Sequence, residues 1–174
     1  ALELDDQLAE AHAVQGLLYL NTHKRSREEG DNVEAAAAFE RALQLNPNLA
    51  STYVWYASLH DIEGRLEEAI DMLTTAMQID PLGRIAYINL PGHYATRGDN
   101  EKATELLLKA IDIFPDWPSP FEYMARQMRS LGRFDEAVAW TLIAQSMTED
   151  PMIGREVVGI YIEFGDFDRV EQFM

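Results

Sequence analysis

Residues 66–81 read LEEAIDMLTTAMQIDP, and residues 100–115 read NEKATELLLKAIDIFP. The second segment begins 34 positions after the first, and both segments end in proline. Residues 32–47, which read NVEAAAAFERALQLNP, follow the same pattern one step earlier. In all three segments, apolar residues recur three and four positions apart, as an amphipathic helix requires. The chain is therefore predicted to repeat one helical unit.

Glycine, alanine and proline keep this 34-residue step over most of the chain. A period shared by several residue types is the signature of a repeat architecture. The positions that keep it are Gly30, Gly64, Gly98 and Gly132; Ala35, Ala69, Ala103 and Ala137; Ala42, Ala76, Ala110 and Ala144; and Pro47, Pro81 and Pro115. A further helical pattern precedes the glycine in residues 9–20, 50–64 and 120–132. The sequence thus predicts an all-α fold of helix–turn–helix units.

The turns of the first and third units carry more detail. Asp31 and Asp99 stand just before a second helix, where a carboxylate caps the free N–H groups. Residues 22–29 interrupt the period with about seven extra residues, which is close to two helical turns. Either a helix lengthens there or the segment forms a mobile basic loop. The loop is slightly favoured, because Thr22, Ser26 and Gly30 are weak helix formers.

The repeats resemble the tetratricopeptide repeat (TPR) family, whose helix pairs stack into a right-handed α-solenoid. The resemblance implies a single array over residues 1–174, with about four full repeats and partial repeats at both ends. Because both ends cut through repeats, we interpret the chain as a piece of a larger protein. The implied segments are residues 1–8 (the tail of a preceding repeat), 9–49 (with the insert), 50–83, 84–117, 118–150 and 151–174 (a partial repeat).

Repeat positions also predict the packing between helices. Small residues are expected where the two helices of a repeat meet, and in the third repeat Pro91 takes that position. An internal proline removes a backbone hydrogen bond and clashes with the carbonyl four residues back, so a kink is predicted between Tyr87 and Pro91. The other small residues are Gly16, Ala57 and Ala125, and the gap to the next repeat is expected to hold Phe39, Leu73, Leu107 and Leu142 or Trp140.

Residues 97–99 spell Arg-Gly-Asp, which is an adhesion tripeptide in other proteins. Here Gly98 is a turn glycine of the 34-residue period, and Asp99 is the expected helix cap. The repeat accounts for both residues, so an adhesive role is not favoured.

Composition excludes several classes of function. The formal charge is −16, which would repel a nucleic-acid backbone or an anionic membrane surface. There is no cysteine, no apolar run long enough to span a membrane and no signal-peptide pattern. The four histidines lack metal-ligand spacing, and no phosphate-binding or nucleophile motif occurs. We therefore expect no enzymatic activity, no metal and no cofactor, although a parent protein could carry a catalytic domain.

TPR arrays bind extended peptides in a concave groove lined by the first helix of each repeat, and the resemblance implies such a groove here. Trp55 is the candidate anchor of an apolar first half. The implied groove residues include Ala13, Leu17, Leu20, Val54, Trp55, Ser58, Asn89, Gly92, Tyr123, Arg126 and Arg129, with Arg155 and Gly159 continuing the line.

Arg126 and Arg129 form a pair of cations on one face of a helix, and arginine pairs bind carboxylates well. One interpretation is a partner peptide with apolar residues and an acidic group. The other, slightly favoured, is that the arginines pair with acids of the chain itself, such as Glu122 or Glu156. Ala13, Leu17 and Asn89 do not make the Lys/Asn clamp of chaperone-binding TPR proteins, so Hsp70 or Hsp90 tails are not favoured as partners.

The sequence thus favours a non-catalytic module that binds a partner peptide or domain. A purely structural segment, which self-associates through exposed repeat ends, is a second hypothesis. A regulatory segment is a third, since residues 1–20 and 42–83 resemble the TPR tails of bacterial class III adenylate cyclases and membrane-anchored winged-helix regulators. A cytoplasmic location is favoured, or the periplasm if the parent is such a membrane-anchored regulator.

Overall fold

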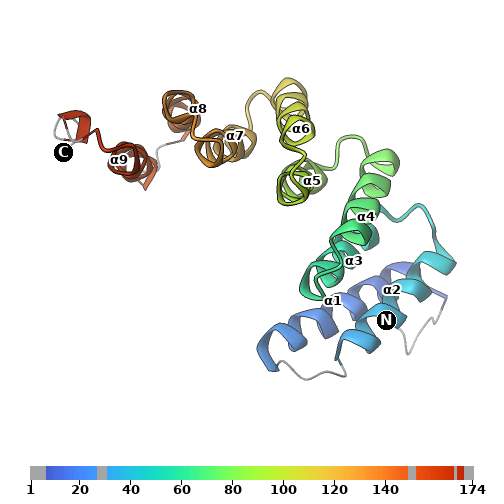
Figure 1. Cartoon of the computed structure of the whole chain (residues 1–174). Coiled ribbons are helices and arrows are strands. Elements are labelled where there is room, and N and C mark those ends of the chain that lie inside the picture. The colour runs from blue at the N-terminus through green and yellow to red at the C-terminus, as the bar shows by residue number, and fades with distance from the viewer. Residues whose placement is uncertain (1–6, 27–30, 149–151, 167, 171–174) are drawn as a thin grey trace. The chain divides into compact units, whose positions relative to one another are not determined.

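The computed structural model describes residues 7–26, 31–148, 152–166 and 168–170, which form helices and short turns without any strand. The all-α prediction is confirmed. Figure 1 shows the helices in chain order. Their bounds are α1 (Ala9–Ser26), α2 (Asp31–Leu45), α3 (Ala50–Ile62), α4 (Leu66–Ile79), α5 (Arg84–Arg97), α6 (Asn100–Ile113), α7 (Pro118–Ser130), α8 (Phe134–Ser146) and α9 (Met152–Phe164).

The chain divides into two compact units, Ala1–Asn89 and Leu90–Met174. In the first unit, α1 packs against α2, α3 packs against α4, and α2 and α1 both contact α3. In the second unit, α7 packs against α8, while α6 contacts α7 and α8 contacts α9. Within each unit, neighbours in sequence are thus neighbours in space, as expected for a repeat protein.

Three of the periodic glycines, Gly64, Gly98 and Gly132, follow the first helix of their pair and have left-handed backbone. Gly64, Gly98 and Gly132 have φ values of 71°, 92° and 72°. The residue after each glycine donates its N–H to a carbonyl five positions back, as Asp99 does to Tyr94 at 2.8 Å. This hydrogen bond closes the Schellman motif, in which glycine is favoured because it has no Cβ to strain the positive φ.

The periodic alanines lie at the contacts between paired helices. Ala35, Ala69, Ala103 and Ala137 are all fully buried, and so are Ala42 and Ala110. Gly16 faces a ring directly, since a Cβ at this position would lie 2.6 Å from Phe39. Small residues at these positions let the helices approach closely, and a larger side chain would overpack the contact.

The expected filling residues are fully buried in three repeats, whereas in the fourth Trp140 is half-buried against the core cluster that contains Val157 and Ile160. Phe39, Leu73 and Leu107 are at most 1 % exposed. In the fourth repeat, Leu142 is 40 % exposed and Trp140 is half-buried, whereas Thr141 is 2 % exposed. Thr141 occupies the position because its hydroxyl donates to the Ala137 carbonyl at 2.9 Å, so the polar group is satisfied inside the helix.

The first part of the insert is helical, whereas the sequence slightly favoured a loop. Helix α1 continues through residues 22–26, and only residues 27–29 of the insert lie outside the described part. The Thr22 hydroxyl donates to the Leu18 carbonyl at 2.9 Å, which satisfies it within the helix. Extending an existing helix costs far less than nucleating one, so weak helix formers can still prolong α1.

Helix α5 contains Pro91 without ending there, since its helical residues run from Arg84 to Arg97. Pro91 is buried, in agreement with its place among the small packing residues. The boundary between the two compact units falls just before it, after Asn89. The bend of α5 between Tyr87 and Pro91 stays a prediction.

Candidate functional site

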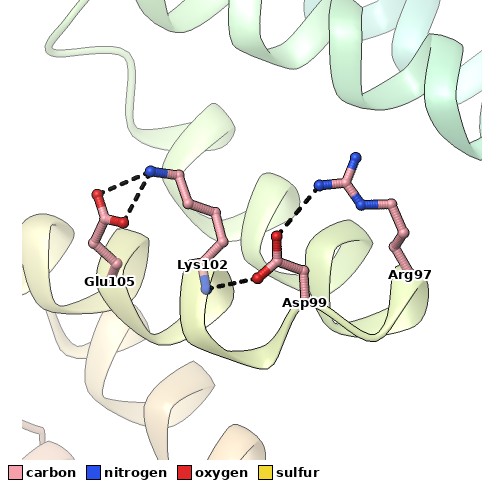
Figure 2. Close-up of polar contacts among 4 residues, drawn as sticks. All are labelled: Arg97, Asp99, Lys102 and Glu105. Atoms are coloured by element: carbon pink, nitrogen blue, oxygen red, sulfur yellow. Dashed lines mark hydrogen bonds and ion pairs between the residues drawn. The ribbon is translucent and has the colours of Figure 1, made fainter.

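The Arg-Gly-Asp tripeptide forms the connection between the end of α5 and the start of α6, and Figure 2 shows the side chains of Arg97 and Asp99 there. The Lys102 backbone N–H donates to Asp99 Oδ1 at 3.1 Å, so the predicted cap of α6 is confirmed. Asp99 Oδ2 lies 3.4 Å from Arg97 Nη2, and the Lys102 ammonium is 2.9 Å from both Glu105 oxygens. These side chains are engaged with one another, and Asp31, the other predicted cap, is itself the first residue of α2.

The candidate groove residues differ in burial. Ala13 and Leu20 are 1 % and 0 % exposed, so they belong to the core and their assignment to a groove is wrong. Leu20 packs with Phe39 and Leu59, because α1 contacts α3 as well as α2. The side chain of Arg155 lies outside the described part. The remaining candidates are half-buried or exposed: Leu17, Val54, Trp55, Ser58, Asn89, Gly92, Tyr123, Arg126, Arg129 and Gly159.

A pocket of about 320 Å³ lies in the first unit, where the start of α3, the end of α4 and the start of α5 meet. It contains two of the candidate residues, Val54 and Trp55. Most of its lining is apolar, and the charged groups Asp80 and Arg84 come from the turn before α5 and its first residue. The lining residues are Ala50, Ser51, Val54, Trp55, Ala76, Asp80, Gly83, Arg84, Ile85 and Ala86.

The turn between α4 and α5 fixes one side of the pocket. The Leu82 N–H donates to Asp80 Oδ1 at 3.1 Å, and the Gly83 N–H donates to the Asp80 carbonyl at 3.0 Å. A Cβ on Gly83 would lie 3.0 Å from Asp80 Oδ2, so glycine lets the carboxylate sit close to the backbone. The turn therefore holds Asp80 in one position beside the pocket.

Trp55 lies between a core cluster and the pocket. It packs against the cluster of Leu20, Ala35, Phe39 and Leu59, and it also lines the pocket. Among the described residues no hydrogen-bond partner is found for the Trp55 indole N–H or for the Ser51 hydroxyl. Both residues line the pocket, whereas the Ser58 hydroxyl donates to the Val54 carbonyl at 3.3 Å.

The two candidate arginines of α7 have different surroundings. Arg129 Nε lies 2.5 Å from Glu163 of α9, and the guanidinium makes a second hydrogen bond to the same carboxylate. These bonds lower the pKa of Glu163. Arg126 lies over the Tyr123 ring at 5.0 Å and is exposed. Arg129 therefore pairs with an acid of the chain itself, Glu163.

Asn89 and Gly92 lie on either side of the boundary between the compact units, so each is described within its own unit. Gly92 is exposed, and a Cβ added there would meet nothing within 4 Å. The described residues contain no group of three histidine, aspartate or glutamate side chains arranged to hold a metal ion. None of the described helices has the length and apolar character of a membrane span.

Residues 26–82 match the model of the tetratricopeptide repeat family. The Hsp70-Hsp90 organising protein of Plasmodium falciparum is 39 % identical over 59 residues, which are 34 % of this chain and 23 % of that protein. The probable biofilm formation methyltransferase WspC of Pseudomonas aeruginosa is 33 % identical over 86 residues, 49 % of this chain and 20 % of that protein. The chain thus spans less than a quarter of the length of these two relatives.

Solved structures show the same fold. The crystal structure of PilW, a type IV pilus biogenesis factor, matches with a TM-score of 0.79 at 22 % identity, covering 99 % of this chain and 77 % of that chain. Periodic alanines, left-handed turn glycines and paired helices agree with the family match and with this likeness. Residues 26–82 thus match the tetratricopeptide repeat family, and the chain has the all-α solenoid fold of tetratricopeptide repeat proteins.

Proposed function

We propose that the chain is a non-catalytic interaction module that binds a partner peptide on the first helices of its repeats, with the pocket at Val54 and Trp55 as the main anchor. TPR proteins bind protein or peptide partners and are generally scaffolds. The pocket carries the proposal, since it is apolar, includes an aromatic side chain and offers hydrogen-bond donors beside it. Such a combination of an apolar cavity with a few polar groups is typical of a ligand site.

A random peptide library selected on the immobilised chain tests this proposal. Selected peptides are titrated by fluorescence anisotropy against the wild type and against Val54→Asp, which places a charge in the pocket. We expect binding to fall at least tenfold, because an unpaired carboxylate is costly in an apolar site. Val33→Asp is the matched control, since Val33 lies on α2 and is 71 % exposed. Equal affinity of both variants would contradict the proposal.

The second unit offers a separate contact for an acidic group of the partner. With Arg129 paired to Glu163, Arg126 over Tyr123 is the remaining cation of the predicted pair. An exposed guanidinium positioned by a ring is able to receive a carboxylate. The proposal that the partner carries an acidic group therefore rests on Arg126 alone.

Self-association is a second candidate function, favoured by an exposed apolar face on α1. Val14 and Leu18 are 47 % and 61 % exposed. With the insert taken into account, their equivalents in the second repeat are Trp55 and Leu59, which pack against the preceding repeat. The face would accordingly suit another helix or a second copy. Light scattering of wild type and Leu18→Asp over a range of concentrations tests it, and a monomeric wild type at high concentration contradicts it.

The role of a parent protein is a further proposal. A regulatory TPR segment of a bacterial signalling protein, such as an adenylate cyclase or a transcriptional regulator, is consistent with a chain that matches only parts of longer relatives. One of these relatives is named a methyltransferase, so a catalytic domain elsewhere in a parent is compatible with a non-catalytic array here.

A further inference from the structure

We propose that the pocket of the first unit takes an apolar side chain of the partner peptide that has a lysine or arginine beside it, and that Asp80 pairs with this cation. The inference rests on the proposed function and names the chemistry of the peptide. Three observations support it: the Oδ2 atom of Asp80 has no partner among the described residues, polar residues line the apolar pocket, and residues 1–89 carry an excess of acidic side chains.

Asp80 keeps one carboxylate oxygen for a ligand. Its Oδ1 accepts the Leu82 N–H at 3.1 Å, while Oδ2 makes no hydrogen bond or ion pair with the described residues. Asp80 is exposed although it lines the pocket, so an incoming cation reaches it from solvent. Because the Leu82 hydrogen bond fixes the carboxylate, little side-chain freedom is lost when a cation binds.

The pocket floor suits an apolar side chain of the size of leucine or phenylalanine. Its walls are formed by Val54, Ala76 and Ile85, with Trp55 as the largest residue of the lining. A cavity of about 320 Å³ lies at the small end of the range for ligand pockets. Trp55 and Ser51 both line the pocket, and each carries a hydrogen-bond donor that a carbonyl of an extended peptide could use.

Charge complementarity selects a cation rather than an anion. The segment that forms the first unit, residues 1–89, contains 15 aspartate and glutamate residues against 6 lysine and arginine residues. Among the described residues that line the pocket, Arg84 is the only cation, and it is already engaged within the protein. A negative field of this kind attracts a basic residue of the peptide to the first unit and repels an acidic residue there.

A positional peptide library tests the inference on the full chain. Acetylated and amidated hexapeptides with a fixed central leucine or phenylalanine are displayed, and the other positions are randomised. We expect enrichment of lysine or arginine within two positions of the fixed residue. Enrichment of aspartate or glutamate there, or of no charge at all, overturns the inference.

One enriched peptide is then titrated against Asp80→Asn, which keeps an Oδ1 acceptor for Leu82 and removes the charge. We expect binding to weaken about three- to fivefold, as for an exposed ion pair. Asp112→Asn is the control, because Asp112 is an exposed acid of α6 and its substitution changes the net charge equally. When the basic residue of the peptide is replaced by glutamine, wild type and Asp80→Asn are expected to bind alike. A persisting difference contradicts a direct pair.

The outcomes separate this inference from the proposed function. If peptides bind and Val54→Asp abolishes binding while Asp80→Asn has no effect, the pocket is the site but the basic residue is not recognised. If no peptide is enriched, or if Val54→Asp binds normally, both the inference and the proposed function fail. If the chain forms a dimer that Val54→Asp disrupts, a second copy occupies the pocket and the inference is wrong.

Discussion

Tyr87 joins a first helix to the turn before it through one hydroxyl. Its phenol donates to the Pro81 carbonyl at 3.1 Å, and Tyr53, which is 34 residues earlier, donates to the Pro47 carbonyl at 3.0 Å. The Tyr87 bond is partly buried and the Tyr53 bond is exposed. The two tyrosines thus make the same hydrogen bond at different exposure to solvent, so their contributions to stability can be compared directly.

Replacing Tyr87 by phenylalanine is expected to lower the free energy of unfolding by about 1 kcal/mol, the usual contribution of one hydrogen bond. Tyr53→Phe should cost less, because water replaces an exposed hydrogen bond more easily. Urea denaturation followed by circular dichroism measures both variants. A larger loss for Tyr53→Phe would show that solvent shielding does not decide the strength of this contact.

His60 predicts a pH dependence at the same scale. The ring is 4 % exposed, stacks on Tyr56 at a centroid distance of 4.6 Å, and has an Nδ1 without a partner in the described part. Burial, and next the charge of Arg65, lowers the pKa of His60 below its usual 6.5. Below about pH 6.5, His60 therefore binds a proton in the unfolded chain but stays neutral in the folded chain. The free energy of unfolding falls as the pH drops from about 6.5 towards the lower pKa of the folded state.

The variant His60→Phe retains an aromatic ring and cannot be protonated. We expect the difference in unfolding free energy between this variant and the wild type to grow in favour of the variant from pH 7.5 to pH 5.5. Chemical denaturation at several pH values measures it. Because both proteins share all carboxylates, their titration cancels in the comparison. A constant difference over this range would mean that the folded protein accepts the proton as readily as the unfolded chain.

Single residues also show where sequence reasoning reaches its limit. The period alone identified the buried alanines, the left-handed glycines and the Asp99 cap. It did not identify Thr141, because a polar residue in a filling position was passed over in favour of its apolar neighbours. What decides there is a hydrogen bond to the Ala137 carbonyl, and that bond exists only once the helix has formed.

At the scale of the element, α5 carries the least regular feature of the array. Pro91 is buried in the position that Gly16, Ala57 and Ala125 take in other repeats, and the helix continues through it. An internal proline costs about 3 kcal/mol relative to alanine, through the lost hydrogen bond and the ring clash. Alanine is already accommodated at this position in two other repeats, so it should fit with little loss of packing.

We therefore expect Pro91→Ala to raise the free energy of unfolding by about 2 kcal/mol, since part of the gain is offset by the smaller buried side chain. Thermal and urea denaturation measure the change. Ala125→Pro is the reciprocal control and should destabilise α7. If Pro91→Ala is less stable than the wild type, the surroundings of α5 are adapted to the proline, and the predicted kink becomes part of the packing.

Elements also explain why the candidate site was only partly predictable. The resemblance to TPR arrays implied that Val54 and Trp55 lie in a groove on the first helix of the second repeat, and the pocket contains both. Asp80 and Gly83 were missed because they belong to a turn, and only tertiary structure brings that turn beside α3. The proline-marked end of each second helix was a usable signal, since residues just before and after such a proline flank the start of the next first helix. The insert was misjudged because intrinsic propensity carried more weight than the extension of an existing helix.

At the scale of the whole molecule, the excess of negative charge affects the stability of the folded state. The chain contains 30 acidic residues against 14 lysine and arginine residues. Many of these acids are exposed on second helices, such as Asp71 on α4 and Asp112 on α6. Repulsion among them opposes a compact state, whereas the unfolded chain spreads the same charges further apart.

We therefore expect the melting temperature to rise when sodium chloride is increased from 10 to 150 mM, because the screening length shortens from about 30 Å to about 8 Å. Differential scanning calorimetry at constant pH measures the shift. The double variant Asp71→Asn and Asp112→Asn should melt at a higher temperature than the wild type at 10 mM salt and respond less to added salt. Ion pairs such as Arg129–Glu163 are weakened by the same screening, so they act in the opposite direction. A melting temperature that falls with salt would mean that these local pairs outweigh the repulsion of the excess acids.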